Sequence, residues 1–207
     1  MSKTLTTSVT GMSVAHFDMI GLGPLVFGKP VHEEARDDET PEQREQRLFI
    51  QKAHINEHGI AYIPAAAVKK SLEWAASWLN MKLPGGAGGK ATYTKRFKAG
   101  IMMNHPEFVL SKNGKEVSAD DLETLRLFVM SGCTSGGRVW RNWPILRGEW
   151  HATASFILTD ESISPEVLEK HARCGGLHDG IGSLRIGRGG PNGMWKMENL
   201  QVEPFEM

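Results

Sequence analysis

The chain has 207 residues, and its 24 lysines and arginines balance its 24 aspartates and glutamates, so the formal net charge is zero. This balance excludes binding to nucleic acid through overall charge, although a local basic surface is still possible. No apolar run reaches the roughly 18 residues of a membrane span, and the first residues lack the apolar core of a signal peptide. The two cysteines, Cys133 and Cys174, have no CxxC spacing, which argues against a zinc site. We expect a cytoplasmic protein without metal or cofactor.

The first half of the chain alternates predicted strands with one strong helix. We expect a strand over 4–17 and a hairpin over 49–63. Between them we expect an exposed acidic insertion over 31–47, which forms either a short helix from Pro41 or a disordered loop. Apolar residues at helical spacing predict a helix over 65–79. Trp74 and Trp78 are four residues apart on that helix, and we interpret them as core packing. Residues 83–98 are too basic and glycine-rich for core, and predict a flexible loop.

The second half predicts a strand over 101–110, a turn at 112–115, and a strand over 150–160. Ser164 and Pro165 are the cap and first residue of a helix that ends at Gly175 and Gly176. Residues 194–202 form the closing strand. Strands with two main helices predict one α+β domain over 1–207, built around an antiparallel sheet.

Glycine, basic and aromatic residues coincide in three windows that contain no acidic side chain. These windows are 74–106, 124–148 and 180–197. Glycine lets another chain approach the backbone, arginine matches phosphate oxygens, and aromatic rings stack on unpaired bases. We therefore predict a surface for a polyanion; the alternative is a set of turns and linkers, in which the arginines are solvated and Tyr93 and Phe97 anchor the basic loop. The residues expected to bind nucleic acid are Lys69, Lys90, Tyr93, Lys95, Arg96, Lys98, Arg138, Trp140, Arg141, Gly180, Gly182, Arg185, Gly187 and Arg188.

Two of these motifs together resemble a known family. A strand ending in Ile63-Pro64 precedes a helix that carries Lys69, and Gly180, Gly182 and Gly187 form a loop near the end of the chain. This combination resembles the RAMP superfamily, the RNA-recognition-type proteins that form backbone and processing subunits of CRISPR effector complexes. The chain is most similar to small phage-encoded members of that type.

The resemblance implies a modified ferredoxin-like fold with a basic, thumb-like insertion at about 84–105. It also implies binding of RNA or single-stranded DNA by side-by-side copies, together with other subunits of a ribonucleoprotein complex and without a membrane. Some members of the family cut RNA with an aspartate after the first strand, or with a histidine. Asp18 lies in the corresponding region, but the family's surrounding pattern is missing.

Three functions follow from these observations. The first is a non-catalytic subunit that assembles along a single strand of nucleic acid. The second is an endoribonuclease that uses one of several histidines as a general acid or base: His16, His54, His105 or His178. The third is a protein-interaction or inhibitor module, in which the acidic segment 33–45 mimics nucleic acid or docks a partner. We favour the first because no pair of titratable residues has a diagnostic spacing.

Overall fold

The computed structural model describes residues 8–85, 91–130 and 137–206. Its main sheet contains β1 (Ser8–Gly21), β4 (Ile101–Met103), β6 (Ser111–Lys112), β7 (Lys115–Glu116), β10 (His151–Leu158) and β11 (Trp195–Glu206). Their order is β11-β1-β10-β6-β7, and β4 also pairs with β10. The central register places Ala15 opposite Phe156 and Phe17 opposite Ala154.

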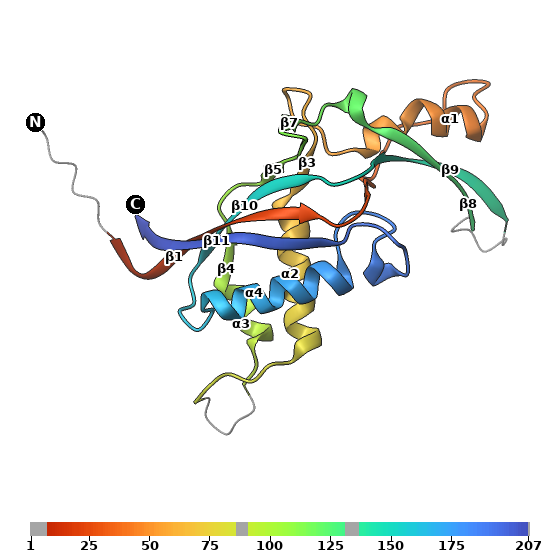
Figure 1. The fold of residues 1–207 in the computed structure, drawn as a ribbon. Coiled ribbons are helices and arrows are strands. Elements are labelled where there is room, and N and C mark those ends of the chain that lie inside the picture. Colours follow the sequence, from red (N-terminus) through yellow and green to blue (C-terminus); the bar gives the residue numbers. More distant parts are fainter. Residues whose placement is uncertain (1–7, 86–90, 131–136, 207) are drawn as a thin grey trace, which may run out of the picture.

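Three helices lie on one side of this sheet (Figure 1). They are α2 (Ala65–Leu79), α3 (Tyr93–Gly100) and α4 (Pro165–Cys174). Taken in chain order, β1, α2, β4, β10, α4 and β11 give the ferredoxin-like βαββαβ arrangement, with strands ordered β11-β1-β10-β4 and all neighbours antiparallel. The α+β, ferredoxin-like fold predicted from the sequence is confirmed.

Two smaller sheets flank this body. The hairpin of β8 (Glu123–Met130) and β9 (Arg138–Leu146) extends away from the helices, and β2 (Leu25–Val26) pairs with its base (Figure 1). β3 (Tyr62–Pro64) pairs with β5 (Glu107–Val109).

α1 (Pro41–Leu48) lies against the hairpin of β8 and β9. The predicted cap is present, because the Thr40 side chain accepts a hydrogen bond from the Gln43 backbone N–H. Glu45 joins helix to hairpin: its carboxylate accepts hydrogen bonds from Lys52 Nζ at 2.6 Å and from the Asn142 backbone N–H at 3.0 Å, and it pairs with Arg141. Glu33 and Glu39 pair with Arg47. These internal pairs leave the acidic segment less available for a partner than its sequence suggests.

Several boundaries differ from those predicted. Residues 50–52 form a 3₁₀ turn, so the expected hairpin over 49–63 is reduced to a single bridge between Ile55 and Ala61. The expected strand over 101–110 is split into β4 and β5, because Pro106 cannot donate a ladder hydrogen bond. Residues 93–98, predicted as loop, belong to α3. The sheet reaches further than expected at two ends, to Gly21 and to Glu206.

A histidine is buried in the core between sheet and helices. His171 of α4 is fully buried, its ring stacks on Phe97 at 4.2 Å between centroids, and its Nδ1 lies 2.6 Å from the Val167 carbonyl oxygen. Burial lowers the pKa of the His171 imidazole, because a charged ring would lose its hydration there.

We expect the protein to lose stability as the pH falls below about 6.5, the ordinary pKa of histidine. In that range the unfolded chain binds a proton at residue 171 that the folded chain does not bind, so the free energy of unfolding decreases. Melting temperatures between about pH 7.5 and 5.5 test this. The variant His171→Leu should show a smaller slope; an equal slope in variant and wild type would contradict the prediction.

Candidate nucleic-acid interface

The glycine-rich segment after α4 folds into a loop that is held by backbone hydrogen bonds to β2 and to the turn before it. The Ser183 N–H donates to the Val26 carbonyl oxygen at 2.7 Å, and the Gly193 N–H donates to the Pro24 carbonyl oxygen at 2.8 Å. A Cβ built at Gly193 would overlap the Ile181 carbonyl oxygen, and the φ of Gly193 is +75°. Glycine is required here because two stretches of backbone approach within the space that a side chain would occupy.

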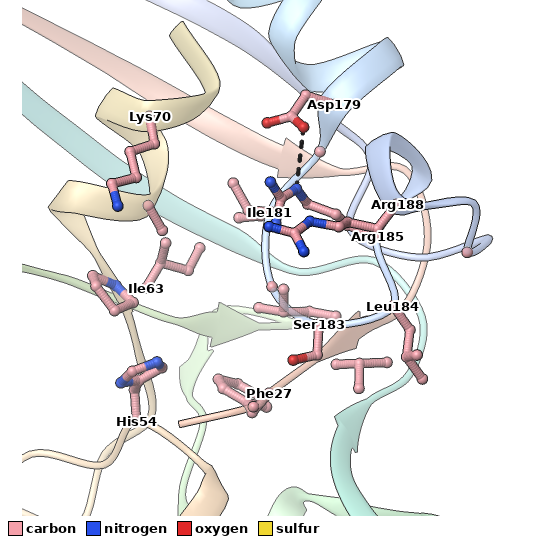
Figure 2. Close-up of a pocket in the computed structure, with 18 of the residues that line it drawn as sticks. Phe27, His54, Ile63, Lys70, Asp179, Ile181, Ser183, Leu184, Arg185 and Arg188 are labelled. Carbon is pink, nitrogen blue, oxygen red and sulfur yellow. Dashed lines mark hydrogen bonds and ion pairs between the residues drawn. The ribbon is translucent and has the colours of Figure 1, made fainter. Parts of the chain in front are cut away.

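A pocket of about 650 Å³ opens between this loop and the first half of α2 (Figure 2). Lys70 enters it from α2, and Arg185 and Arg188 enter it from the opposite wall. Its remaining surface combines backbone and apolar side chains, such as Phe27, Ile63 and Ile181, with the polar side chains of His54, Tyr62, Asp179 and Ser183. The three cationic side chains therefore share one concave surface.

The buried carboxylate of Asp179 orients one of these three cationic side chains, Arg185. Arg185 Nε donates to Asp179 Oδ1 at 3.1 Å, and the Asp179 side chain is 5% exposed. Burial raises the pKa of the Asp179 carboxyl, and the nearby Arg185 and Arg188 offset only part of that effect. In the described part of the chain, neither Lys70 nor Arg188 has an acidic partner within 4 Å. The pocket therefore has cationic groups available for an anion.

The predicted residues of the C-terminal loop lie together. Gly180, Gly182, Arg185 and Arg188 all line the pocket. Gly187 lies behind it, in a short 3₁₀ turn, where a Cβ would overlap the Asp179 carboxylate. Each of these glycines serves the close packing of the loop, which shapes the pocket wall.

On α2, Lys70 occupies the position in the pocket that the sequence assigned to Lys69. The two residues are about 100° apart around the helix, so only one of them can face the pocket. Lys69 Nζ donates to the Lys98 carbonyl oxygen at 3.1 Å and lies 3.5 Å from Glu73. Lys69 was expected from the resemblance at the helix entry, and that short motif does not determine which of two adjacent lysines faces the pocket.

The basic stretch around α3 forms a second, separate region. Lys95 and Lys98 are exposed, and Arg96 pairs with Asp160 at 3.0 Å. The assignment of Tyr93 as a stacking side chain is corrected: its ring is 3% exposed and packs against His171. Lys90 lies outside the described residues.

The third region is the β8–β9 hairpin. Arg138 and Arg141 are exposed, and Arg141 pairs with Glu45. Trp140 is also exposed, but the Arg126 guanidinium lies over its ring at 4.5 Å from the centroid. Neither this region nor α3 contributes to the pocket. The fold thus distributes the predicted residues over three surfaces.

Candidates for catalysis are sparse. His54 lines the pocket, and burial, with a smaller contribution from Lys29, lowers the pKa of its imidazole. Asp18 lies on the main sheet, where it accepts hydrogen bonds from Thr153 and Asn199. Within residues 8–85, 91–130 and 137–206, no three His, Cys, Asp or Glu side chains gather as metal ligands would.

Several solved structures have the same fold as this chain. One is a chain from the cryo-EM structure of the type III-B Cmr-beta bound to cognate target RNA, with a TM-score of 0.55 and 10% identity over 94% of this chain. A second is Cmr6 from Pyrococcus furiosus, with a TM-score of 0.52 and 10% identity over 92% of this chain. The protein shares the fold of these subunits.

The extent of the likeness differs between the two neighbours. The match covers all of the Cmr6 chain but 61% of the Cmr-beta chain. No protein-family model matches the sequence, and a search of curated proteins gives no match. The ferredoxin-like fold that the resemblance implied is therefore shared with these two structures, while membership of the RAMP superfamily and the similarity to its phage-encoded members stay predictions. Within the described ranges, no helix is long and apolar enough to cross a membrane.

Proposed function

We propose that this protein is a non-catalytic subunit that binds RNA or another single-stranded nucleic acid within a ribonucleoprotein assembly. The observation that carries the proposal is the convergence of Lys70, Arg185 and Arg188 on one pocket beside the glycine loop. The shared fold adds support, because one neighbour of this fold is in a structure bound to cognate target RNA.

The chemistry of the pocket suits a phosphate backbone better than a base. Lysine and arginine neutralise phosphates, and this contact carries no sequence information by itself. Asp179 holds the Arg185 side chain in place before the strand arrives, so less conformational entropy is lost on binding. We infer that the pocket binds the phosphate backbone of the nucleic acid and makes no sequence-specific contact with the bases.

The proposal includes assembly of neighbouring copies along the strand, because a few phosphate contacts give only weak affinity at physiological salt. The hairpin beside the acidic segment offers a surface for that contact: Leu127, Phe128, Met130 and Trp140 are exposed there. Binding should then strengthen stepwise with strand length. Equal affinity per site on short and long strands, with a monomeric protein, would contradict assembly.

The direct test is the purified protein itself. An absorbance excess at 260 nm, in a particle larger than one chain, would support both binding and assembly. Protein freed of nucleic acid should bind a fluorescein-labelled oligouridylate of about 20 nucleotides in an anisotropy titration, with an affinity that falls steeply with salt. Absence of binding at low salt would refute the proposal.

The exposed lysines of α3 provide a separate prediction. Replacing Lys95 and Lys98 with alanine should lower the salt slope of binding by roughly 1.4, because about two fewer counterion sites are released from a single strand. Anisotropy titrations at several salt concentrations measure that slope. A slope equal to that of the wild type would mean that the strand does not pass over α3.

Endoribonuclease activity is the second candidate, and His54 is the observation that favours it. This imidazole lies in the pocket, and its lowered pKa keeps it neutral near pH 7, as a general base requires. Incubation with structured and unstructured RNA in a chelator would reveal cleavage. Loss of that cleavage in His54→Ala, with binding retained, would establish the enzyme and replace the non-catalytic assignment.

A further inference from the structure

Two tryptophans form an exposed, ordered pair on α2. The rings of Trp74 and Trp78 stack at 5.1 Å between centroids, with 15° between their planes. Trp78 is 68% exposed, the largest fraction among the large hydrophobic side chains that the structure describes. The sequence assigned both to the core. An exposed ring of this size costs free energy in water unless something covers it.

The pair lies on the same flank of α2 as Lys70. Lys70, Trp74 and Trp78 are spaced four residues apart, and side chains at that spacing are neighbours along a helix surface. Lys70 lines the basic pocket, so the stripe begins in the pocket and runs toward the end of the helix at Leu79. The tryptophans therefore extend the α2 wall of the pocket, which faces Arg185 and Arg188.

The charges around the stripe favour an anionic partner. Glu73, the acidic residue of α2, pairs with Lys69 on another flank of the helix. The stripe itself carries one cation followed by two flat, electron-rich rings. Phosphate pairing next to aromatic stacking is how proteins hold single strands without reading their sequence.

We propose that the Trp74–Trp78 pair is a stacking platform for an unpaired base of a single-stranded nucleic acid whose phosphates lie in the basic pocket. This inference rests on the proposed function, and it adds the element that the pocket lacks: contact with a base. Trp74 supports Trp78 from behind, and Trp78 presents its outer face to the base. The platform distinguishes a single strand from a duplex, because paired bases have no free face.

The test compares Trp78→Ala with the wild type on the labelled oligouridylate of about 20 nucleotides. We expect about tenfold weaker binding from the loss of one stacked base. The salt slope should stay unchanged, because tryptophan neutralises no phosphate. Trp78→Phe keeps a smaller ring and should recover part of the affinity. Met102→Ala removes another exposed apolar side chain, from β4, and should bind as the wild type does.

A second probe isolates the base. On a strand of equal length made of abasic residues, wild type and Trp78→Ala should bind equally. Full binding of oligouridylate by Trp78→Ala, or an equal loss on the abasic strand, would overturn the platform while leaving the pocket's role intact. If Trp78→Ala retains oligouridylate binding but loses a co-purifying protein, the face is a protein-docking surface and the inference is wrong. Failure of the wild type to bind any strand would overturn both proposals.

Discussion

Replacing Lys70 and Arg188 together with glutamine is expected to weaken binding of a single strand by about 10- to 100-fold at moderate salt. Both side chains enter the same pocket, from α2 and from the glycine loop, and glutamine keeps most of their length while removing the charge. The salt slope should fall by about 1.4, since each phosphate contact on a single strand contributes roughly 0.7. Anisotropy titrations over a range of salt concentrations give both quantities.

The matched control removes two charges elsewhere. Lys112 and Lys115 lie on the β6–β7 hairpin, outside the pocket, and their replacement by glutamine lowers the net charge equally. If binding follows net charge alone, the two double variants will weaken it to the same extent. A larger loss in the Lys70 and Arg188 variant assigns the contact to the pocket, whereas equal losses would contradict that assignment.

Replacing Gly193 with alanine is expected to lower the free energy of unfolding by about 3 kcal/mol or more. The added Cβ would overlap the Ile181 carbonyl oxygen, and the φ of +75° is unfavourable for alanine. Because Gly193 is buried, the loop cannot simply shift away from the clash. Chemical denaturation measures the loss of stability.

Gly189→Ala separates the two causes. Gly189 has a φ of +78°, but a Cβ there would meet no atom within 4 Å. In this variant the free energy of unfolding should fall only by the cost of placing alanine in a left-handed backbone conformation, about 1–2 kcal/mol. Similar losses at both positions would mean that the close approach at Gly193 contributes little. The same reasoning applies to Gly182→Val: a Cβ at this position would lie 2.5 Å from the Val26 carbonyl oxygen, so stability should fall together with binding.

The sequence predicted the elements whose ends carry local signals. α4 begins where Ser164 caps it, with the Val167 N–H donating to the Ser164 hydroxyl at 3.4 Å, and α2 matches its predicted bounds. The glycine loop was also found, because its glycines and arginines are adjacent in sequence. Signals of this kind depend on neighbouring residues in the sequence, so they allow correct prediction without any knowledge of tertiary contacts.

Prediction failed where tertiary contacts decided the outcome. α3 follows a glycine-rich stretch and has a weak helical signal, yet it forms because Tyr93 and Phe97 are buried beside His171. Trp78 was assigned to the core because it is apolar at helical spacing, but among the described residues only Trp74 is seen stacked against its ring. The pocket combines Lys70 with Arg188, residues more than a hundred positions apart, and no sequence spacing could relate them.

The central place of β1 has a consequence for how the chain is made. Its partners on either side are β10 and β11, and about 130 residues separate its end at Gly21 from the start of β10. A ribosome needs on the order of 10 s to add that many residues. During this time β1 has no strand to pair with, and its apolar side chains Ala15, Phe17 and Met19 are not yet covered by the completed core. The nascent protein must therefore keep an unpaired strand from pairing with other chains until β10 emerges, which makes it a candidate client for chaperones that hold unfolded segments.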